Sequence, residues 1–302
     1  LNSHEFSTFF KSNRHWLEPY AVFCFLRDKY HTAHFSDWQQ LSVYSQPEIE
    51  IMCKPEAESY PELQFTYFVQ YILHLQLLEV TTYARSKGVI LKGDLPIGIS
   101  RDSVEAWMEP QYFNLDSQTG APPDAFSYNG QNWNFPTYNW EAMYKDGCRW
   151  WRQRFANMEQ YFDAFRIDHV LGFFRIWEIP CSAVHGLLGH FSPSLPFTIS
   201  EIEYYGLTFH KNVYTRPFIN DSVLVKYFGI HASYVCEHFL KKTSYDMYDL
   251  LPEYDTQVKV KEEFNGKNDE NSLWIRDGLY RLISNVLFIE DTRNPDMCHP
   301  RI

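Results

Sequence analysis

YFDAFRIDHVLGFFRIWEIP, residues 161–180, is the stretch from which the fold of this chain can be inferred. Its pattern indicates the end of a helix, a short buried strand and a loop at the carboxyl end of that strand. Side chains alternate between the two faces of a strand, so Arg166 and Asp168 are expected to share one face. Phe165 and Ile167 are expected on the opposite face, packed beneath helices.

Arg166 and Asp168 are candidate catalytic residues. An arginine two residues from an aspartate favours the ionised carboxylate, which is the form that a nucleophilic aspartate requires. The same pair is also typical of an ordinary salt-bridged strand face. The rest of the sequence must therefore decide between these two interpretations.

Composition limits the class of protein. The 302 residues could form one large domain or two smaller ones. The net charge of −11 argues against nucleic acid or an anionic membrane as a partner. The six cysteines have no paired spacing, which predicts reduced thiols in a cytoplasmic protein. No signal peptide, long apolar run, histidine cluster or Gly-rich phosphate loop is found, so we expect no membrane insertion, metal or organic cofactor.

The order of the predicted elements is typical of an α/β protein with a parallel sheet. We expect helices over residues 16–30, 61–87 and 147–162, and strands over 89–91 and 164–168. An apolar stripe that advances by threes and fours predicts the buried face of the second helix: Phe68, Tyr71, Ile72, Leu75, Leu78 and Tyr83. Asp94 and Asp168 each follow a strand, at the edge where such folds build their sites.

Two regions depart from this order. Residues 98–138 are predicted to be a long ordered loop, and a loop of this length inside a compact domain is usually functional. Residues 185–302 are expected to form an inserted, mostly helical subdomain, which leaves residues 1–184 as the α/β part. Within the subdomain we expect helices near 221–241 and 244–250, an exposed loop at 262–272, and a helix that runs into a strand over 279–291.

Three motifs together resemble the 4-α-glucanotransferases of glycoside hydrolase family 77. They are GDLPIG (93–98), PPDAFSYNGQNWNFP (122–136) and FRIDHVLGFFRIWEIP (165–180). Their order and spacing are those of the family. The wording of LKGDLPIGISRDS (91–103) and HGLLGHFSPSLP (185–196) is similar to the cytosolic, maltose-using disproportionating branch of that family.

The resemblance implies a fold and a reaction. The fold would be a (β/α)8 TIM barrel with insertions, of which this chain would hold the middle portion. The reaction would be the retaining transfer of α-1,4-glucosyl units from maltose or maltodextrin to a glucan such as glycogen or a heteroglycan. Asp168 matches the nucleophile that becomes glycosylated, Arg166 the residue that keeps it ionised, and His169 a contact to the bound glucose. Residues that match sugar-binding positions are Asp94, Asp124, Gln131 and Trp133.

Some of these residues have ordinary structural alternatives. Asp124 follows two prolines and is equally suited to a turn. Trp133 is equally suited to anchoring its loop in a core. For other aromatic residues we expect packing instead of sugar binding: Trp107, Tyr112, Phe113, Trp150 and Trp151.

The sequence does not contain the motif that supplies the second catalytic carboxyl group in this family. A retaining glycosidase uses a nucleophile and an acid/base about 5 Å apart. The family takes its acid/base from a Glu-Asp-Leu-Gly stretch and a third carboxylate from a later His-Asp, and neither stretch occurs in these 302 residues. Glu290 in LFIEDTRNP lacks the following Leu-Gly, and we do not expect it to be the acid/base.

We therefore expect a partial glucanotransferase sequence that is inactive by itself and poorly soluble. The chain begins at Leu1 without a methionine. A non-catalytic protein that binds α-glucans is a second possibility. An α-amylase-like hydrolase would share the barrel and the aspartate nucleophile, but the PPDAFSYNGQNW loop resembles the transferases.

Overall fold

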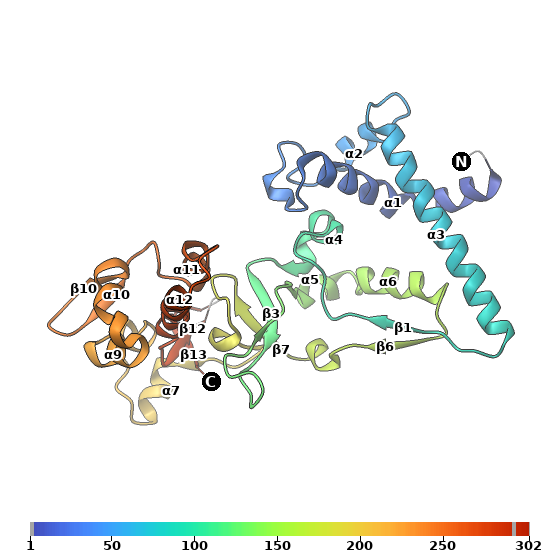
Figure 1. Cartoon of the computed structure of the whole chain (residues 1–302). Coiled ribbons are helices and arrows are strands. Elements are labelled where there is room, and N and C mark those ends of the chain that lie inside the picture. The colour runs from blue at the N-terminus through green and yellow to red at the C-terminus, as the bar shows by residue number, and fades with distance from the viewer. Residues whose placement is uncertain (1–2, 292–293, 302) are drawn as a thin grey trace. The chain divides into compact units, whose positions relative to one another are not determined.

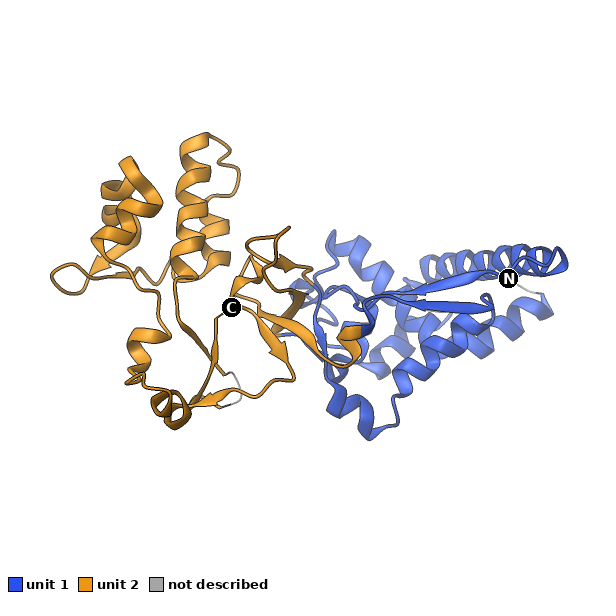
Figure 2. Ribbon diagram, turned by 90° about the horizontal axis from the view of Figure 1, so that it is seen from below, with its two compact units in different colours: residues 1–115, 135–170 blue, residues 116–134, 171–302 orange. Residues whose placement is uncertain are grey.

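The structure is a computed structural model that describes residues 3–291 and 294–301. It divides into two compact units, which Figure 2 shows in different colours. Unit 1 comprises residues 1–115 and 135–170, and unit 2 comprises residues 116–134 and 171–302. The boundary expected after residue 184 does not coincide with this division, because residues 117–121 pair with residues 176–180 in one sheet.

Helices form most of unit 1. Their bounds are α1 His4–Tyr30, η1 Phe35–Asp37, α2 Gln46–Met52, α3 Tyr60–Ser86, α4 Val104–Met108, η2 Pro110–Tyr112, α5 Trp140–Lys145 and α6 Arg149–Glu159. The three predicted helices are present, and α1 extends back to His4 because the Ser3 side chain caps it by accepting from the backbone N–H of Phe6. A shared core joins α1, α2 and α3 through Leu17, Leu26, Ile49, Leu63 and Tyr67.

The face of α3 that is buried differs from the predicted stripe. Leu63, Tyr67 and Thr81 are the buried side chains of this helix, whereas Phe68 and Tyr83 are 42% and 65% exposed. The Tyr67 ring meets the Phe10 ring of α1 at 5.0 Å, so the position of α1 selects the buried face. The sequence therefore predicted the helix α3 correctly, but it did not predict which face of the helix is buried against α1.

Two parallel strands, β1 Lys92–Leu95 and β6 Ala164–Ile167, form the sheet at the centre of the predicted motif (Figure 1). The strand expected at 89–91 begins later, at Lys92, and Ile90 is 73% exposed. A structural reason is that Gly88 ends α3 with a φ of 70° and Leu91 pairs with Asp163 instead. The expected burial of Phe165 and Ile167 is also not seen, since they are 36% and 42% exposed.

Residues 98–138 contain short strands and helices and are not a simple loop. Strand β2 Phe113–Asn114 pairs with β5 Thr137–Tyr138 in unit 1. Near this pair the ring of Phe113 meets that of Trp150 at 5.6 Å, and the ring of Tyr138 meets that of Trp151 at 5.4 Å. The aromatic residues expected to pack are all buried: Trp107, Tyr112, Phe113, Trp150 and Trp151.

Unit 2 contains an antiparallel sheet with the strand order β4-β3-β7-β8. Its strands are β3 Ser117–Ala121, β4 Gln131–Asn132, β7 Ile176–Pro180 and β8 His190–Ser192. Trp177 and Ile179 of β7 are fully buried beneath it. The PPDAFSYNG loop is therefore the connection of a β3–β4 hairpin.

The remainder of unit 2 contains more helix than strand. Helix η3 Val170–Phe173 spans the boundary between the units, since Val170 belongs to unit 1. The helices that lie wholly in unit 2 are η4 Gly186–Leu188, α7 Ile199–Tyr204, α8 Lys211–Tyr214, α9 Asp221–Phe228, η5 Gly229–His231, α10 Ala232–Phe239, α11 Gln257–Glu263 and α12 Glu270–Ile283. Its strands are β9 Phe197–Thr198, β10 Leu240–Lys242, β11 Tyr248–Leu250, β12 Phe288–Glu290 and β13 Met297–Pro300.

The helix predicted near 244–250 is wrong. Residues 240–250 form the antiparallel hairpin β10–β11, in which the N–H of Thr243 donates to the carbonyl of Met247 at 2.9 Å. The loop predicted at 262–272 is partly helical, because α12 begins at Glu270 with Asp269 as its cap. The helix followed by a strand predicted over 279–291 is confirmed by α12 and β12.

All six cysteines are free thiols. None of the helices in the described part of the chain is long and apolar enough to cross a membrane.

Candidate functional site

Asp94 and Arg166 lie opposite each other on the parallel strands β1 and β6. Neighbouring side chains in register project from the same face of a sheet. The guanidinium donates from Nε to Asp94 Oδ1 at 2.7 Å and from its terminal nitrogen to Oδ2 at 2.5 Å. This two-point ion pair is open to solvent, and it holds the pKa of the Asp94 carboxyl below its ordinary value.

Asp168 lies directly after β6, at its carboxyl end. Its backbone N–H donates to the carbonyl of Leu95 at 3.0 Å and extends the pairing with β1 by one step. Its side chain is exposed. His169 follows with a φ of 47°, the left-handed conformation, so the chain turns sharply away from the strand. Arg166 was expected to pair with Asp168, but it pairs with Asp94, because Asp94 is its register partner and the nearer carboxylate. Asp168 still interacts with Arg166 electrostatically.

Asp124 has the turn role that its sequence position allowed. Its Oδ1 accepts from the backbone N–H groups of Phe126 at 2.8 Å and Ser127 at 2.6 Å. These bonds form an Asx turn, and they shape the tip of the β3–β4 hairpin. The rings at that tip, Phe126 and Tyr128, are 98% and 87% exposed.

Gln131 and Trp133 are brought together on the returning strand of the same hairpin. The indole Nε1 of Trp133 donates to Gln131 Oε1 at 3.0 Å. The backbone N–H of Trp133 donates to the carbonyl of Thr119 at 2.8 Å, which anchors the residue beside β3. Gln131 is exposed and Trp133 half-buried, so the polar edge of this pair can reach a ligand.

The predicted residues therefore fall into two groups, one in each unit. Asp94, Arg166, Asp168 and His169 belong to unit 1. Asp124, Gln131 and Trp133 belong to unit 2.

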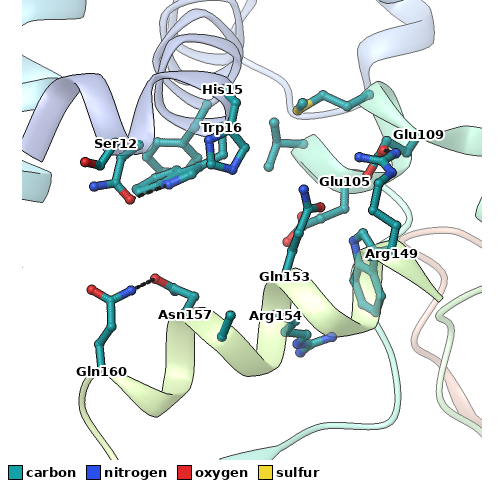
Figure 3. A pocket seen from close by; sticks show the side chains of 16 residues that line it. Ser12, His15, Trp16, Glu105, Glu109, Arg149, Gln153, Arg154, Asn157 and Gln160 are labelled. Carbon is teal, nitrogen blue, oxygen red and sulfur yellow. Dashed lines mark hydrogen bonds and ion pairs between the residues drawn. The ribbon is translucent and has the colours of Figure 1, made fainter. Parts of the chain in front are cut away.

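Two pockets in the described residues are lined by none of the predicted site residues. The larger, of about 980 Å³, lies in unit 1. Figure 3 shows Ser12 and Trp16 on one side of it, and on the other Gln153 and Asn157 along α6 and Gln160 directly after that helix. Two carboxylates line this pocket, Glu105 and Glu109, and Glu109 is already paired with Arg149. The candidate site is instead the group of carboxylates at the ends of β1 and β6, because the family motifs contain them.

Sequence reasoning missed the residues that position β6. Asp163 accepts from Arg85 Nε at 2.7 Å and from the backbone N–H of Leu91 at 3.1 Å, so it joins the end of α3 to the start of both strands. His74 Nδ1 lies 2.7 Å from the Tyr161 hydroxyl and ties α3 to the same segment. The signal available in the sequence was Asp163, an acidic residue directly before the predicted strand.

Glu290, the tempting candidate for an acid/base, is engaged elsewhere. It lies on β12 in unit 2, where its carboxylate forms an ion pair with Lys211 Nζ at 3.2 Å and accepts a hydrogen bond from the Thr215 hydroxyl at 3.0 Å. The neighbouring Asp291 lies 2.8 Å from His299 Nε2. These contacts give both carboxylates structural partners.

Comparison with known proteins agrees with the motifs. The glycoside hydrolase family 77 model, described as 4-alpha-glucanotransferase, matches residues 1–284. The chain is 42% identical over 307 residues to the 4-alpha-glucanotransferase DPE2 of Oryza sativa subsp. japonica, covering 100% of this chain and 32% of the rice protein. It is 37% identical over 172 residues to the 4-alpha-glucanotransferase of Chlamydia pneumoniae, covering 57% of this chain and 32% of that protein.

A solved structure is also similar. The amylomaltase from Streptococcus agalactiae in complex with acarbose matches with a TM-score of 0.57 and 28% sequence identity, covering 63% of this chain and 39% of that one. The chain spans about a third of the length of the curated relatives that it matches. The motifs and these matches show that the chain belongs to the 4-alpha-glucanotransferases of glycoside hydrolase family 77.

Proposed function

We propose that this chain forms part of the glucan cleft of a 4-α-glucanotransferase whose nucleophile is Asp168. The observation that carries the proposal is the position of Asp168 directly after the β1–β6 pair, within the FRIDHVLGFFRIWEIP motif. Carboxyl ends of parallel strands are where barrel enzymes carry their catalytic groups. The Asp94–Arg166 pair at the same strand ends gives that edge a fixed charge arrangement.

The proposed reaction has two steps. A carboxylate oxygen of Asp168 bonds to C1 of the donor glucose while the C1–O bond to the leaving sugar breaks, and the leaving oxygen takes up a proton. A hydroxyl of an acceptor glucan then attacks C1, loses its proton and releases Asp168. The products keep the α configuration because C1 is inverted twice.

The other predicted residues would bind and orient the sugar. His169, turned away from the strand, would contact the donor glucose, and Asp94 would hold Arg166 in place and border the site. On the hairpin, Gln131 would bond sugar hydroxyls while Trp133 offers an apolar ring face. Asp124 would act by shaping the hairpin tip, as its turn bonds suggest.

We also propose that residues 1–184 belong to a (β/α)8 barrel and that residues 185–302 form an insertion. The parallel β1–β6 pair and the helix α6 that leads into β6 support a barrel. The mostly helical make-up of the segment after β8 supports an insertion. We expect a cytoplasmic location, which the six free thiols support.

By themselves these 302 residues are proposed not to turn over maltose. Departure of a sugar alcohol needs a proton donor, and the best candidate in sequence, Glu290, is held by Lys211 and Thr215. A donor whose leaving group needs no proton tests the nucleophile without requiring an acid/base residue. α-Maltosyl fluoride is such a donor, because fluoride departs without protonation.

The experiment follows fluoride release from α-maltosyl fluoride by the purified chain. We expect slow release that is lost in Asp168→Asn and retained in Asp116→Asn, a matched change at another exposed aspartate. Maltose plus glycogen should release no glucose under the same conditions. Equal fluoride release by wild type and Asp168→Asn would refute the assignment of the nucleophile.

A glucan-binding role without chemistry is the second candidate. The exposed rings of Phe126 and Tyr128 favour it, because aromatic faces exposed on an ordered hairpin suit the apolar faces of sugars. If the chain binds maltoheptaose but the Asp168→Asn substitution does not change fluoride release, glucan binding without catalysis is the correct function.

A further inference from the structure

A pocket of about 350 Å³ lies wholly within unit 2, apart from the residues assigned to glucan transfer. It is bordered by α11, by α12 and by the segment before η4, and Figure 1 shows α11 and α12 beside each other. Its volume falls in the range of small-molecule sites. Its polar lining comprises Asn129, His185, Lys261, Arg276, Asp277, Tyr280, Arg281 and Ser284.

The charge of this lining is opposite to that of the chain. Three cations, Lys261, Arg276 and Arg281, face one carboxylate, Asp277, in a protein whose net charge is −11. Asp277 is already paired with its neighbour Arg276 at 2.8 Å. Among the described residues, the side chains of Lys261 and Arg281 have no hydrogen-bond or ion-pair partner, so two positive charges at the pocket are uncompensated.

The walls of the pocket are held by a buried amide. Gln257 is 1% exposed, and its Oε1 accepts from the backbone N–H of Val184 at 2.8 Å and of His185 at 3.1 Å. Its Nε2 donates to the carbonyl of Tyr280 at 3.0 Å and to the Ser284 hydroxyl at 2.9 Å. One side chain thus fixes three walls of the pocket to each other. The site is built before any ligand arrives, which reduces the cost of binding.

We propose that this pocket binds a phosphate group, either free phosphate or the phosphate of a small phosphorylated sugar. Guanidinium groups match the oxygens of phosphate with paired N–H donors, and a lysine adds a point charge. Arg281 supplies such a guanidinium and Lys261 such a point charge, whereas the Arg276 guanidinium is already bonded to Asp277. A neutral glucan would leave these charges without a counterpart. The inference is independent of glucan transfer, since it uses no residue of the proposed transfer site.

Neutral groups beside the cations suit a sugar ring. The ring of His185 packs edge-on against that of Tyr280 with 5.2 Å between the centroids. Asn129 and Ser284 add an amide and a hydroxyl to the lining. These groups would bond the hydroxyls of a hexose attached to the phosphate, and a hexose phosphate should then bind more tightly than phosphate alone.

Isothermal titration of the full chain with inorganic phosphate and with glucose 6-phosphate tests the proposal. We expect saturable binding of at least one ligand, weakened about tenfold or more in Arg281→Gln and in Lys261→Gln. Lys241→Gln, the same change at an exposed lysine on β10 outside the pocket, is the matched control and should bind as wild type does. Circular dichroism melts confirm that each variant is folded.

The outcomes separate the two sources of phosphate. Tighter binding of glucose 6-phosphate than of phosphate assigns the site to a phosphorylated sugar, whereas equal binding assigns it to free phosphate. The proposal is overturned if neither ligand binds the wild type saturably, or if folded Arg281→Gln and Lys261→Gln bind as tightly as Lys241→Gln. Glucose and sodium chloride at matched concentration control for the sugar ring and for ionic strength.

Discussion

Arg166 forms its two hydrogen bonds with Asp94, its register partner on β1, and not with Asp168, two residues further along its own strand. The arginine is thereby held at the strand edge by a partner that is not the proposed nucleophile. Asp168 interacts with Arg166 electrostatically, and its own side chain is exposed to solvent. This separation of roles gives the first prediction.

Replacing Arg166 with methionine should return the pKa of Asp94 toward its ordinary value. The cause is loss of the guanidinium hydrogen bonds, the largest influence on that carboxyl. NMR titration of the aspartate side-chain carbons measures it. Asp163 is the internal control, because Arg85 lowers its pKa independently and should continue to do so. An unchanged Asp94 titration in the variant would show that the ion pair is absent in solution.

Lowering the pH should destabilise the fold through His74. Burial lowers the pKa of this histidine below 6.5, its ordinary value. The unfolded chain therefore binds a proton that the folded chain resists, and the free energy of unfolding falls as the pH drops below about 6.5. Urea unfolding at pH 7.5 and 5.5 should show a smaller drop in His74→Gln than in wild type.

His34 should affect the pH dependence of stability in the direction opposite to His74. Its hydrogen bond to Asp102, at 2.8 Å, raises its pKa. Protonation of His34 therefore adds stability that is present below the ordinary pKa and lost as the pH rises through the folded pKa. The drop in stability on acidification should be larger in His34→Gln than in wild type. Identical pH profiles for both variants would contradict the two assignments.

Gly278 should resist replacement by alanine. A Cβ on this buried helical glycine would overlap the ring of Phe228. Alanine normally stabilises a helix by up to about 1 kcal/mol over glycine, but overpacking costs about 1–3 kcal/mol, so net destabilisation is expected. Chemical unfolding measures it, and Phe228→Leu in the same chain should recover part of the loss. A stabilised Gly278→Ala would mean that α9 and α12 are less closely packed.

Gln257→Met should destabilise unit 2 by about 1–3 kcal/mol. Methionine has a similar shape but leaves the N–H groups of Val184 and His185 and the Ser284 hydroxyl without this partner. Thermal and urea unfolding measure the loss. Gln160→Met, at an exposed amide on the surface of unit 1, is the control and should change stability little. Equal stability of the two variants would argue against the buried network.

The sequence predicted those parts of the fold that depend on local pattern. The helices α1 and α3 follow from their apolar periods and from Gly88, and β6 follows from its apolar residues and its neighbours. The partner of Arg166 could not be predicted, because it depends on the register between strands far apart in the chain. The hairpin β10–β11 was mistaken for a helix since short apolar runs fit both periods.

The motifs provide a set of candidate site residues, but they do not provide the geometry of those residues. The family motifs supplied all seven residues, and the structure places them at a strand end and on a hairpin. Asp124 shows the limit: its carboxylate bonds the loop backbone, a role that the Pro-Pro-Asp pattern allowed but did not select over sugar binding. The bonds of Asp163 were missed because they link residues that are far apart in the chain.

The central claim is that Asp168 carries the glucosyl group. The most direct measurement is mass spectrometry of peptides from the chain after reaction with 5-fluoro-α-glucosyl fluoride, whose ring fluorine slows breakdown of a covalent intermediate. We predict one added 5-fluoroglucosyl group on the peptide that contains Asp168, absent in Asp168→Asn and present in Asp116→Asn. A label on another residue, or an unlabelled Asp168 in chain that binds acarbose, would contradict the account.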